Sequence, residues 1–119
     1  MLGYQDHKVL GTVTSEVKMT ELPNDQKTKK TEFIIVVDRN NAKKLKEEGK
    51  KSSDFFQCEA FGKNAEILGM YLKKNDPIFL SGEFHIDRIE KDTPNGVDVH
   101  YFPKYIVEDF RLISQKRES

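Results

Sequence analysis

Two phenylalanines in one short segment offer the clearest chemistry in this sequence. Along the run Asp54 to Phe61 (DFFQCEAF), strand alternation places Phe55 and Phe61 on the same side as Gln57 and Glu59. Aromatic rings among polar side chains suit base stacking, which contributes about 1–3 kcal/mol per base without sequence preference. The same pattern would arise in a strand buried on both faces, or where the rings pack under a loop or against a second subunit.

Lysines gather immediately before this segment. From Arg39 to Lys51 there are six basic and two acidic residues, and the lysines include Lys43, Lys44 and Lys50. Such lysines can follow a phosphate backbone, because neutralised phosphates release counterions. A run of charge is also typical of a solvated loop. The whole chain has no net charge, with 20 basic and 20 acidic residues, so total charge does not favour a nucleic-acid partner.

Other kinds of site find little support in the sequence. His7, His85 and His100 are far apart and lack the spacing of metal ligands. Cys58 is the only cysteine, which excludes an intramolecular disulfide, and its place in the strand favours an inert core position. There is no glycine-rich phosphate loop, and no nucleophile or carboxylate pair in a recognisable catalytic motif. We therefore expect a protein that is not an enzyme and holds no metal or cofactor.

The sequence also bears on location. No apolar run approaches the roughly 20 residues that a membrane helix needs. The segment Met1 to His7 lacks the basic and apolar regions of a signal peptide. We expect a cytoplasmic protein that does not enter a membrane.

Three strands are predicted in the first half of the chain. Alternation is weak from Lys8 to Met19, the first strand, and a turn follows at Pro23-Asn24-Asp25. The β-branched run Thr31 to Asp38 predicts a second strand, buried on both faces. The lysine-rich segment Asn40 to Ser53 has no apolar periodicity and is expected to be a loop or a distorted hairpin tip. The third strand is Asp54 to Phe61, and its core-facing side chains are Phe56, Cys58 and Ala60.

One helix and two further strands follow. Helical spacing predicts a helix from Lys63 to Lys74, with Asn75 as a left-handed cap. Pro77 to Glu90 alternates as a strand interrupted by Gly82, as at a bulge. Residues 93–96 predict a turn, and the last strand, residues 97–113, is expected to break near Pro103. The apolar positions are Ala65, Leu68, Tyr71 and Leu72 in the helix, and Ile78, Leu80, Phe84 and Ile86 in the strand.

This order of elements indicates a fold class. A single helix between the third and fourth of five strands is the order of the OB fold, a small and partly open Greek-key barrel. We therefore predict an all-β domain over residues 1–113, a five-stranded OB-fold barrel with one α-helix between strands 3 and 4. Residues 114–119 are expected to form a short disordered end. Other small β-barrels would also accommodate this order.

From the third strand onward, the sequence resembles the central signature of the bacterial and bacteriophage single-stranded DNA-binding proteins. The matching motifs are DFFQCEAFGK at residues 54–63, Tyr71-Leu72-Lys73-Lys74 at the end of the helix, and Phe79-Leu80-Ser81-Gly82-Glu83 in the next strand. The similarity covers residues 8–113.

The resemblance implies roles for individual residues. Phe55 and Phe61 match aromatics that stack on bases, and Tyr101 resembles an aromatic at the start of the last strand. Lys63 and Arg88 match basic residues along the DNA path. We expect single-stranded DNA to lie across the second, third and fourth strands. The further phosphate contacts would come from Arg39, Lys43, Lys44, Lys50 and Lys51.

The resemblance also implies a function and an assembly. The implied function is sequence-independent binding and protection of single-stranded DNA during replication, recombination or repair, in a bacterial cell or a phage-infected host. Family members are usually tetramers or dimers, so we expect a homo-oligomer, with a tetramer favoured over a dimer. One alternative is an accessory OB-fold protein that acts mainly through replication or recombination proteins. Another is an OB-fold that binds oligosaccharide or serves as a scaffold.

Among the departures of the sequence from the family pattern, two bear on binding and on partners. Asn41 and Ile89 stand where well-known members place stacking aromatics, so weaker binding or a different footprint is expected. The printed sequence ends at Gln115-Lys116-Arg117-Glu118-Ser119, without the acidic tail of the family. We therefore expect a short version, of the phage or mobile-element kind, and recruitment of partner enzymes through such a tail is not implied.

Overall fold

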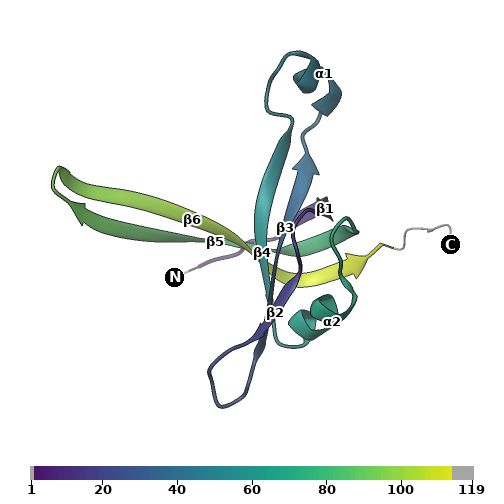
Figure 1. The fold of residues 1–119 in the computed structure, drawn as a ribbon, viewed down its shortest axis with the longest axis vertical. Helices are drawn as coiled ribbons and strands as arrows, with labels where there is room; N and C mark the ends of the chain where they lie inside the picture. The colour runs from purple at the N-terminus through teal and green to yellow at the C-terminus, as the bar shows by residue number, and fades with distance from the viewer. Residues whose placement is uncertain (1, 114–119) are drawn as a thin grey trace.

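The computed structural model describes residues 2–113, so the predicted disordered end at 114–119 lies outside the described residues. Within residues 2–113 there are six strands and two helices (Figure 1). The strands are β1 (His7–Val13), β2 (Lys18–Glu21), β3 (Lys29–Asp38), β4 (Ser53–Phe61), β5 (Pro77–Thr93) and β6 (Gly96–Leu112). The helices are α1 (Ala42–Glu47) and α2 (Lys63–Tyr71).

All six strands belong to one sheet, in the order β1-β5-β6-β4-β3-β2. β1 also pairs with β3, at Thr12↔Val36 and Val13↔Ile35, so the series of pairings returns to β1. The pairing of β4 with β6 is parallel, and the others are antiparallel. This mostly β arrangement, with α2 between β4 and β5, is consistent with the predicted OB fold.

The core lies inside this series of strands and is closed at one end by α2. The Thr31 hydroxyl donates a hydrogen bond to the Ala65 carbonyl at 2.6 Å, which fixes α2 to β3. Phe84 packs edge-on against Tyr105, with ring centroids 5.1 Å apart, where β5 and β6 leave the core. The hydrophobic side chains that are fully or nearly fully buried are Val13, Phe33, Ile35, Cys58, Ala60, Ala65, Leu68, Leu72, Ile78, Leu80, Tyr105 and Val107.

Three hairpins extend from this central body as arms (Figure 1). The β3–β4 arm carries α1 at its tip, the β5–β6 arm is the longest hairpin, and the β2–β3 arm is on the side opposite α1. The radius of gyration is 17.2 Å. A compact chain of this length would have about 13.5 Å. The arms therefore carry a large share of the surface, and they frame the faces on which a long ligand would lie.

The first predicted strand is two strands in the structure, which is why the sheet has six strands and not five. Between β1 and β2, the Thr14 N–H donates to the Ile34 carbonyl at 2.8 Å, and the Ser15 hydroxyl accepts from the Ile34 N–H at 2.8 Å. A side chain thus replaces a backbone acceptor, and the ladder is interrupted. The predicted turn at Pro23-Asn24-Asp25 is confirmed, and Asn24 closes it by accepting from the Thr28 N–H.

Several expectations about burial and strand continuity were wrong. The strand from Thr31 to Asp38 is buried on one face only, because its alternate side chains face solvent on the arm. Ile86 is exposed because β5 has already left the core at that point. β6 continues through Pro103, which pairs with Ile86. The pairing with β4 begins only at Tyr105, so a proline is tolerated at this open edge.

The two helices also differ from expectation. The lysine-rich segment is a hairpin tip as expected, but it contains the six-residue α1, which buries no side chain and so leaves no apolar periodicity. α2 ends at Tyr71, three residues before the predicted end, and Tyr71 is exposed while Ala65, Leu68 and Leu72 are buried. Asn75 has the predicted left-handed conformation (φ 78°), but it lies in the loop after the helix.

Candidate nucleic-acid interface

β4 separates the core from an exposed aromatic surface. Cys58 and Ala60 are fully buried on one side of the strand, and burial raises the pKa of the Cys58 thiol to about 12. On the other side, Phe55 is 64% exposed and Phe61 is 40% exposed. The strand is therefore not buried on both faces, and the predicted division of its side chains is confirmed for these four residues. We call the solvent side of β3, β4 and the adjoining part of β6 the outer face.

β3 contributes the second row of this outer face. In the register of the two strands, Ile34 lies opposite Gln57 and Lys30 lies opposite Phe61. Ile34 is partly exposed, so apolar surface continues from β4 to β3 beside the Gln57 amide. Lys63 is exposed at the first position of α2, two residues after Phe61, at the end of the face.

Between Gln57 and Phe61 the outer face carries a compact group of charges. Glu59 is only 4% exposed, and its Oε1 lies 3.5 Å from Lys30 Nζ and 3.3 Å from Lys104 Nζ. Lys30 Nζ also lies 2.8 Å from Glu32 Oε1. The hydrogen bond to Glu32 raises the pKa of Lys30, and the same bond lowers the pKa of Glu32. Two lysines and two glutamates thus neutralise one another, where the sequence indicated an ordinary exposed glutamate.

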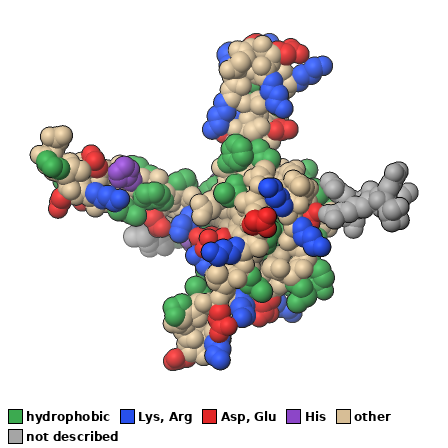
Figure 2. Space-filling model, viewed as in Figure 1, with side chains coloured by type: hydrophobic (Ala, Val, Ile, Leu, Met, Phe, Trp, Pro, Cys, Tyr) green, Lys and Arg blue, Asp and Glu red, His purple; other side chains and the backbone are tan. Residues whose placement is uncertain are grey.

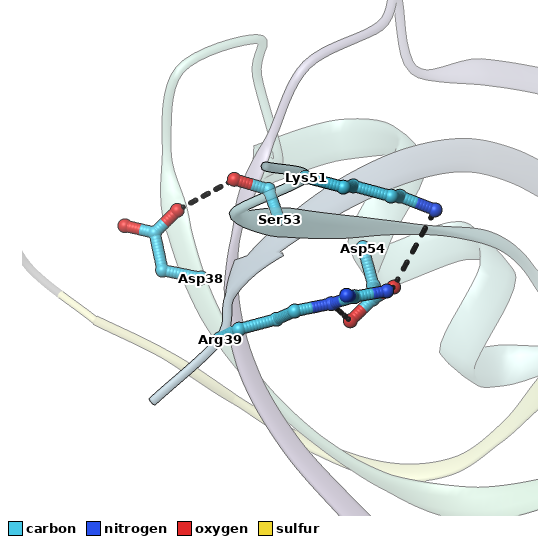
Figure 3. Close-up of polar contacts among 5 residues, drawn as sticks. All are labelled: Asp38, Arg39, Lys51, Ser53 and Asp54. Carbon is cyan, nitrogen blue, oxygen red and sulfur yellow. Dashed lines mark hydrogen bonds and ion pairs between the residues drawn. The ribbon is translucent and has the colours of Figure 1, made fainter. Parts of the chain in front are cut away.

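Arg39 has a structural partner at the base of the β3–β4 arm (Figure 3). Its guanidinium donates two hydrogen bonds to Asp54, at 2.9 and 2.8 Å, and these bonds lower the pKa of the Asp54 carboxyl. Lys51 Nζ lies 3.6 Å from the same carboxylate. The Ser53 hydroxyl donates to Asp38 at 2.9 Å across the arm. Arg39 therefore ties the two strands of the arm together and is not an uncompensated cation.

The lysines around α1 are of two kinds. Lys50 Nζ lies 3.1 Å from Glu48 Oε2, and Lys51 shares Asp54 with Arg39. Lys43 and Lys44 form no ion pair with any of residues 2–113. Figure 2 shows lysine and arginine side chains spread around the tip of this arm with a few acidic ones among them, and acidic and basic side chains mixed over the central body. The tip of this arm is therefore the part of the predicted site where positive charge is least balanced by acidic side chains.

The β5–β6 arm has two faces, and its register assigns the predicted site residues to them. Arg88 lies opposite Tyr101, on the side that continues from the buried pair Phe84 and Tyr105. Arg88 forms an ion pair with Glu90 on that same side. Alternation turns these side chains away from the outer face. The structure therefore exposes Phe55 and Phe61 on one side of β4, with Lys63 exposed two residues beyond Phe61, and it places Arg88 and Tyr101 on the opposite face of the arm.

The other side of this arm adjoins the outer face at a groove that the sequence analysis missed. The groove has a volume of about 450 Å³ and lies between Gln57 of β4 and the arm. Phe102, 44% exposed, is its aromatic wall, and it lies opposite Asp87 in the register. The expected break at Pro103 concealed the alternation that would have identified Phe102. The residues that line the groove are Gln57, Asp87, Ile89, Phe102, Pro103 and Lys104.

Comparison with known proteins identifies the family of this chain. The model of the single-strand binding protein family matches residues 5–113. The chain belongs to the single-strand binding protein family. The resemblance noted from residues 54–83 is thereby confirmed.

Individual relatives of this family member are distant. A single-stranded DNA-binding protein of Fusobacterium nucleatum is 35% identical over 60 residues, which cover 50% of this chain and 38% of that protein. A Thermotoga maritima protein of the same name is 32% identical over 86 residues, covering 72% of this chain and 58% of that protein. Single-stranded DNA-binding protein 2 of Streptococcus agalactiae is 23% identical over 110 residues, covering 92% of this chain and 77% of that protein.

Two positions that depart from the family pattern have different surroundings. Asn41 precedes α1 in a left-handed conformation (φ 66°) at the tip of the β3–β4 arm. Ile89 lines the groove beside Phe102. Among the residues that line this groove, the aromatic ring therefore comes from β6, while β5 contributes Asp87 and Ile89.

Residues 2–113 were also compared with the requirements of a metal site and of a membrane helix. No group of three or more histidine, cysteine or acidic side chains is arranged to hold a metal ion there. Neither α1 nor α2 is long and apolar enough to cross a membrane.

Proposed function

We propose that this chain binds single-stranded DNA without sequence preference over most of its footprint, with bases stacked on Phe55 and Phe61. Family membership over residues 5–113 supports single-stranded DNA as the ligand. The observation that carries the site is the exposure of both rings on one side of β4, while the opposite side of the strand is core. Exposed rings beside Gln57 and Ile34 offer stacking surfaces that accept any base.

The phosphate contacts in this proposal come mainly from Lys43, Lys44 and Lys63, which have no acidic partner in residues 2–113. Arg39, Lys50 and Lys51 would reach phosphates only by sharing or exchanging their present partners. Arg88 and Tyr101 would join the site where the strand continues around the β5–β6 arm to its other face.

We also propose the finer architecture that the resemblance implies. β1 and β2 together would be the first strand of a five-stranded OB barrel, interrupted at residues 14–17. The protein would be a homo-oligomer, a tetramer or a dimer, and it would protect single-stranded DNA in the cytoplasm during replication, recombination or repair. Exposed aliphatic side chains on one side of the β5–β6 arm are consistent with burial in such an assembly; they are Ile86, Val97 and Val99.

A second candidate function follows from the charges on the outer face. The group of Lys30, Glu32, Glu59 and Lys104 leaves that face with little net charge. This favours, as the alternative, an accessory protein that acts mainly through replication or recombination proteins. Such proteins would then be retained by the tagged chain from nuclease-treated extract, and direct DNA affinity would be weak.

The deciding experiment is an anisotropy titration of a labelled dT oligonucleotide at two salt concentrations, with duplex DNA of equal length as the control. We expect tight binding to the single strand, weakened by salt and much poorer on the duplex. Equal binding to both DNA forms, or no binding, would contradict the proposal and favour the accessory function.

A further inference from the structure

We propose that the groove between β4 and the β5–β6 arm is a nucleobase subsite that favours bases with an exocyclic amino group over thymine. This inference rests on the proposed binding of single-stranded DNA, and it adds base selectivity at one position of the path. The groove volume of about 450 Å³ is within the range of about 300–1,000 Å³ found for small-molecule sites.

One wall of the groove offers a stacking surface. Phe102 and Ile89 are each a little over two-fifths exposed, and both face the groove. The His100 ring lies 6.3 Å from the Phe102 ring, tilted by 33°, and supports its side. A base stacked on Phe102 would therefore enter between the arm and β4, next to the bases held by Phe55 and Phe61.

The polar groups of the groove favour a base edge over a phosphate. Asp87 lies directly opposite Phe102, and no ion pair joins its carboxylate to any of residues 2–113. The nearest basic side chain of the groove, Lys104, is held by Glu59 at 3.3 Å. A carboxylate without a partner repels a phosphate, so the DNA backbone would stay outside and the base would point inward.

The same carboxylate distinguishes among bases. Asp87 can only accept hydrogen bonds, and the amino group of cytosine donates them. Thymine presents a carbonyl oxygen at the equivalent position, and its one donor on this edge, N3–H, lies between two carbonyl oxygens that would be held against the carboxylate. The Gln57 amide, across the groove, can both donate and accept, so it can pair with a ring nitrogen or carbonyl of the bound base.

The experiment compares the two base edges. Anisotropy titrations use oligonucleotides of 5-methylcytosine and of thymine, which share the 5-methyl group; 5-methylcytosine has an amino group and an unprotonated N3 where thymine has a carbonyl oxygen and an N3–H. We expect the native chain to bind the 5-methylcytosine strand about ten- to one-hundred-fold more tightly, as for one hydrogen bond to a charged group. Asp87→Asn should bring the two affinities to within about two-fold of each other.

Matched variants separate this subsite from the rest of the path. Asp92→Asn makes the same charge change on the opposite face of the arm and should keep the native preference. Phe102→Ala should weaken binding of both strands. Equal affinity of the native chain for the two strands, or the same preference in the Asp87 and Asp92 variants, would overturn the subsite. In that case, dT binding that depends on Phe55 would still uphold the proposed function. Failure to bind either strand would overturn both.

Discussion

At the scale of single residues, Phe55 and Phe61 are expected to carry most of the stacking energy. Replacing either ring by alanine should weaken binding to a dT oligonucleotide by about 1–3 kcal/mol. Both side chains are exposed, so the melting temperature should change little. Anisotropy titration measures the affinity, and circular dichroism measures the melting. As a control, Tyr71→Ala removes a similarly exposed ring (61%) from α2 and should leave the affinity unchanged. Native affinity in both phenylalanine variants would contradict the stacking assignment.

Residues also show what the sequence can and cannot predict. Alternation along DFFQCEAF predicted the two sides of β4 correctly, because the core packs against only one side of that strand. It could not predict that Glu59 is buried, since that depends on Lys30 and Lys104 arriving from two other strands. Likewise, Arg39 was predicted as a phosphate contact because its partner Asp54 lies 15 positions away and meets it only across the arm.

At the scale of elements, Gly82 allows β5 to turn out of the body into its arm. The register shifts there: Ser81 pairs with Asp109 and Gly82 with Val107, so Glu108 is the extra residue of a bulge. A Cβ on Gly82 would lie 2.0 Å from the Ile106 carbonyl oxygen. We expect Gly82→Ala to lower the free energy of unfolding by about 1–3 kcal/mol, as overpacking does. Urea unfolding measures the loss, and Gly3→Ala, with open space around it, should show none.

The base of the β3–β4 arm should respond to acid. The hydrogen bond from Arg39 holds the pKa of Asp54 below its ordinary 3.8, so the pair stabilises the arm above that pH. Its contribution is lost as the pH falls through the lowered pKa. Amide exchange of the Arg39 N–H, which bonds the Ser52 carbonyl at 2.8 Å, reports opening of the arm. Asp54→Asn should open the arm already at pH 7, whereas Asp25→Asn in the β2–β3 loop should not. Equal protection of the Arg39 N–H from exchange in both variants would contradict this role.

The predictability of the elements follows their burial. β4 and α2 showed their periodicity in the sequence, because one side of each is apolar. β3 was predicted only from its β-branched run, so its exposed side was missed. α1 has no buried side chain, so it left no pattern to detect. The interruption between β1 and β2 depends on the Ser15 side chain bonding the Ile34 N–H, which hydrophobic spacing does not express.

At the scale of the whole molecule, the distribution of charge predicts a shallow dependence of DNA affinity on salt. The chain has no net charge. Of the cations assigned to the DNA path, Lys43, Lys44 and Lys63 form no ion pair in residues 2–113, while Arg39, Lys50, Lys51 and Arg88 each have an acidic partner. Because each phosphate neutralised on a single strand contributes about −0.7 to the slope of log K against log salt, three lysines predict a slope of about −2.

Titrations of a dT oligonucleotide at several salt concentrations measure this slope directly. Replacing Lys43, Lys44 and Lys63 together by glutamine should bring it close to zero while stacking on Phe55 and Phe61 persists, so the affinity at high salt should change little. Replacing Lys8, Lys29 and Lys91 by glutamine removes the same charge elsewhere and should leave the slope near its native value. A native slope steeper than about −4 would contradict the count of three. It would mean that Arg39 and the other paired cations leave their carboxylates for phosphates when DNA binds, so that the ion pairs of the free protein are exchanged on binding.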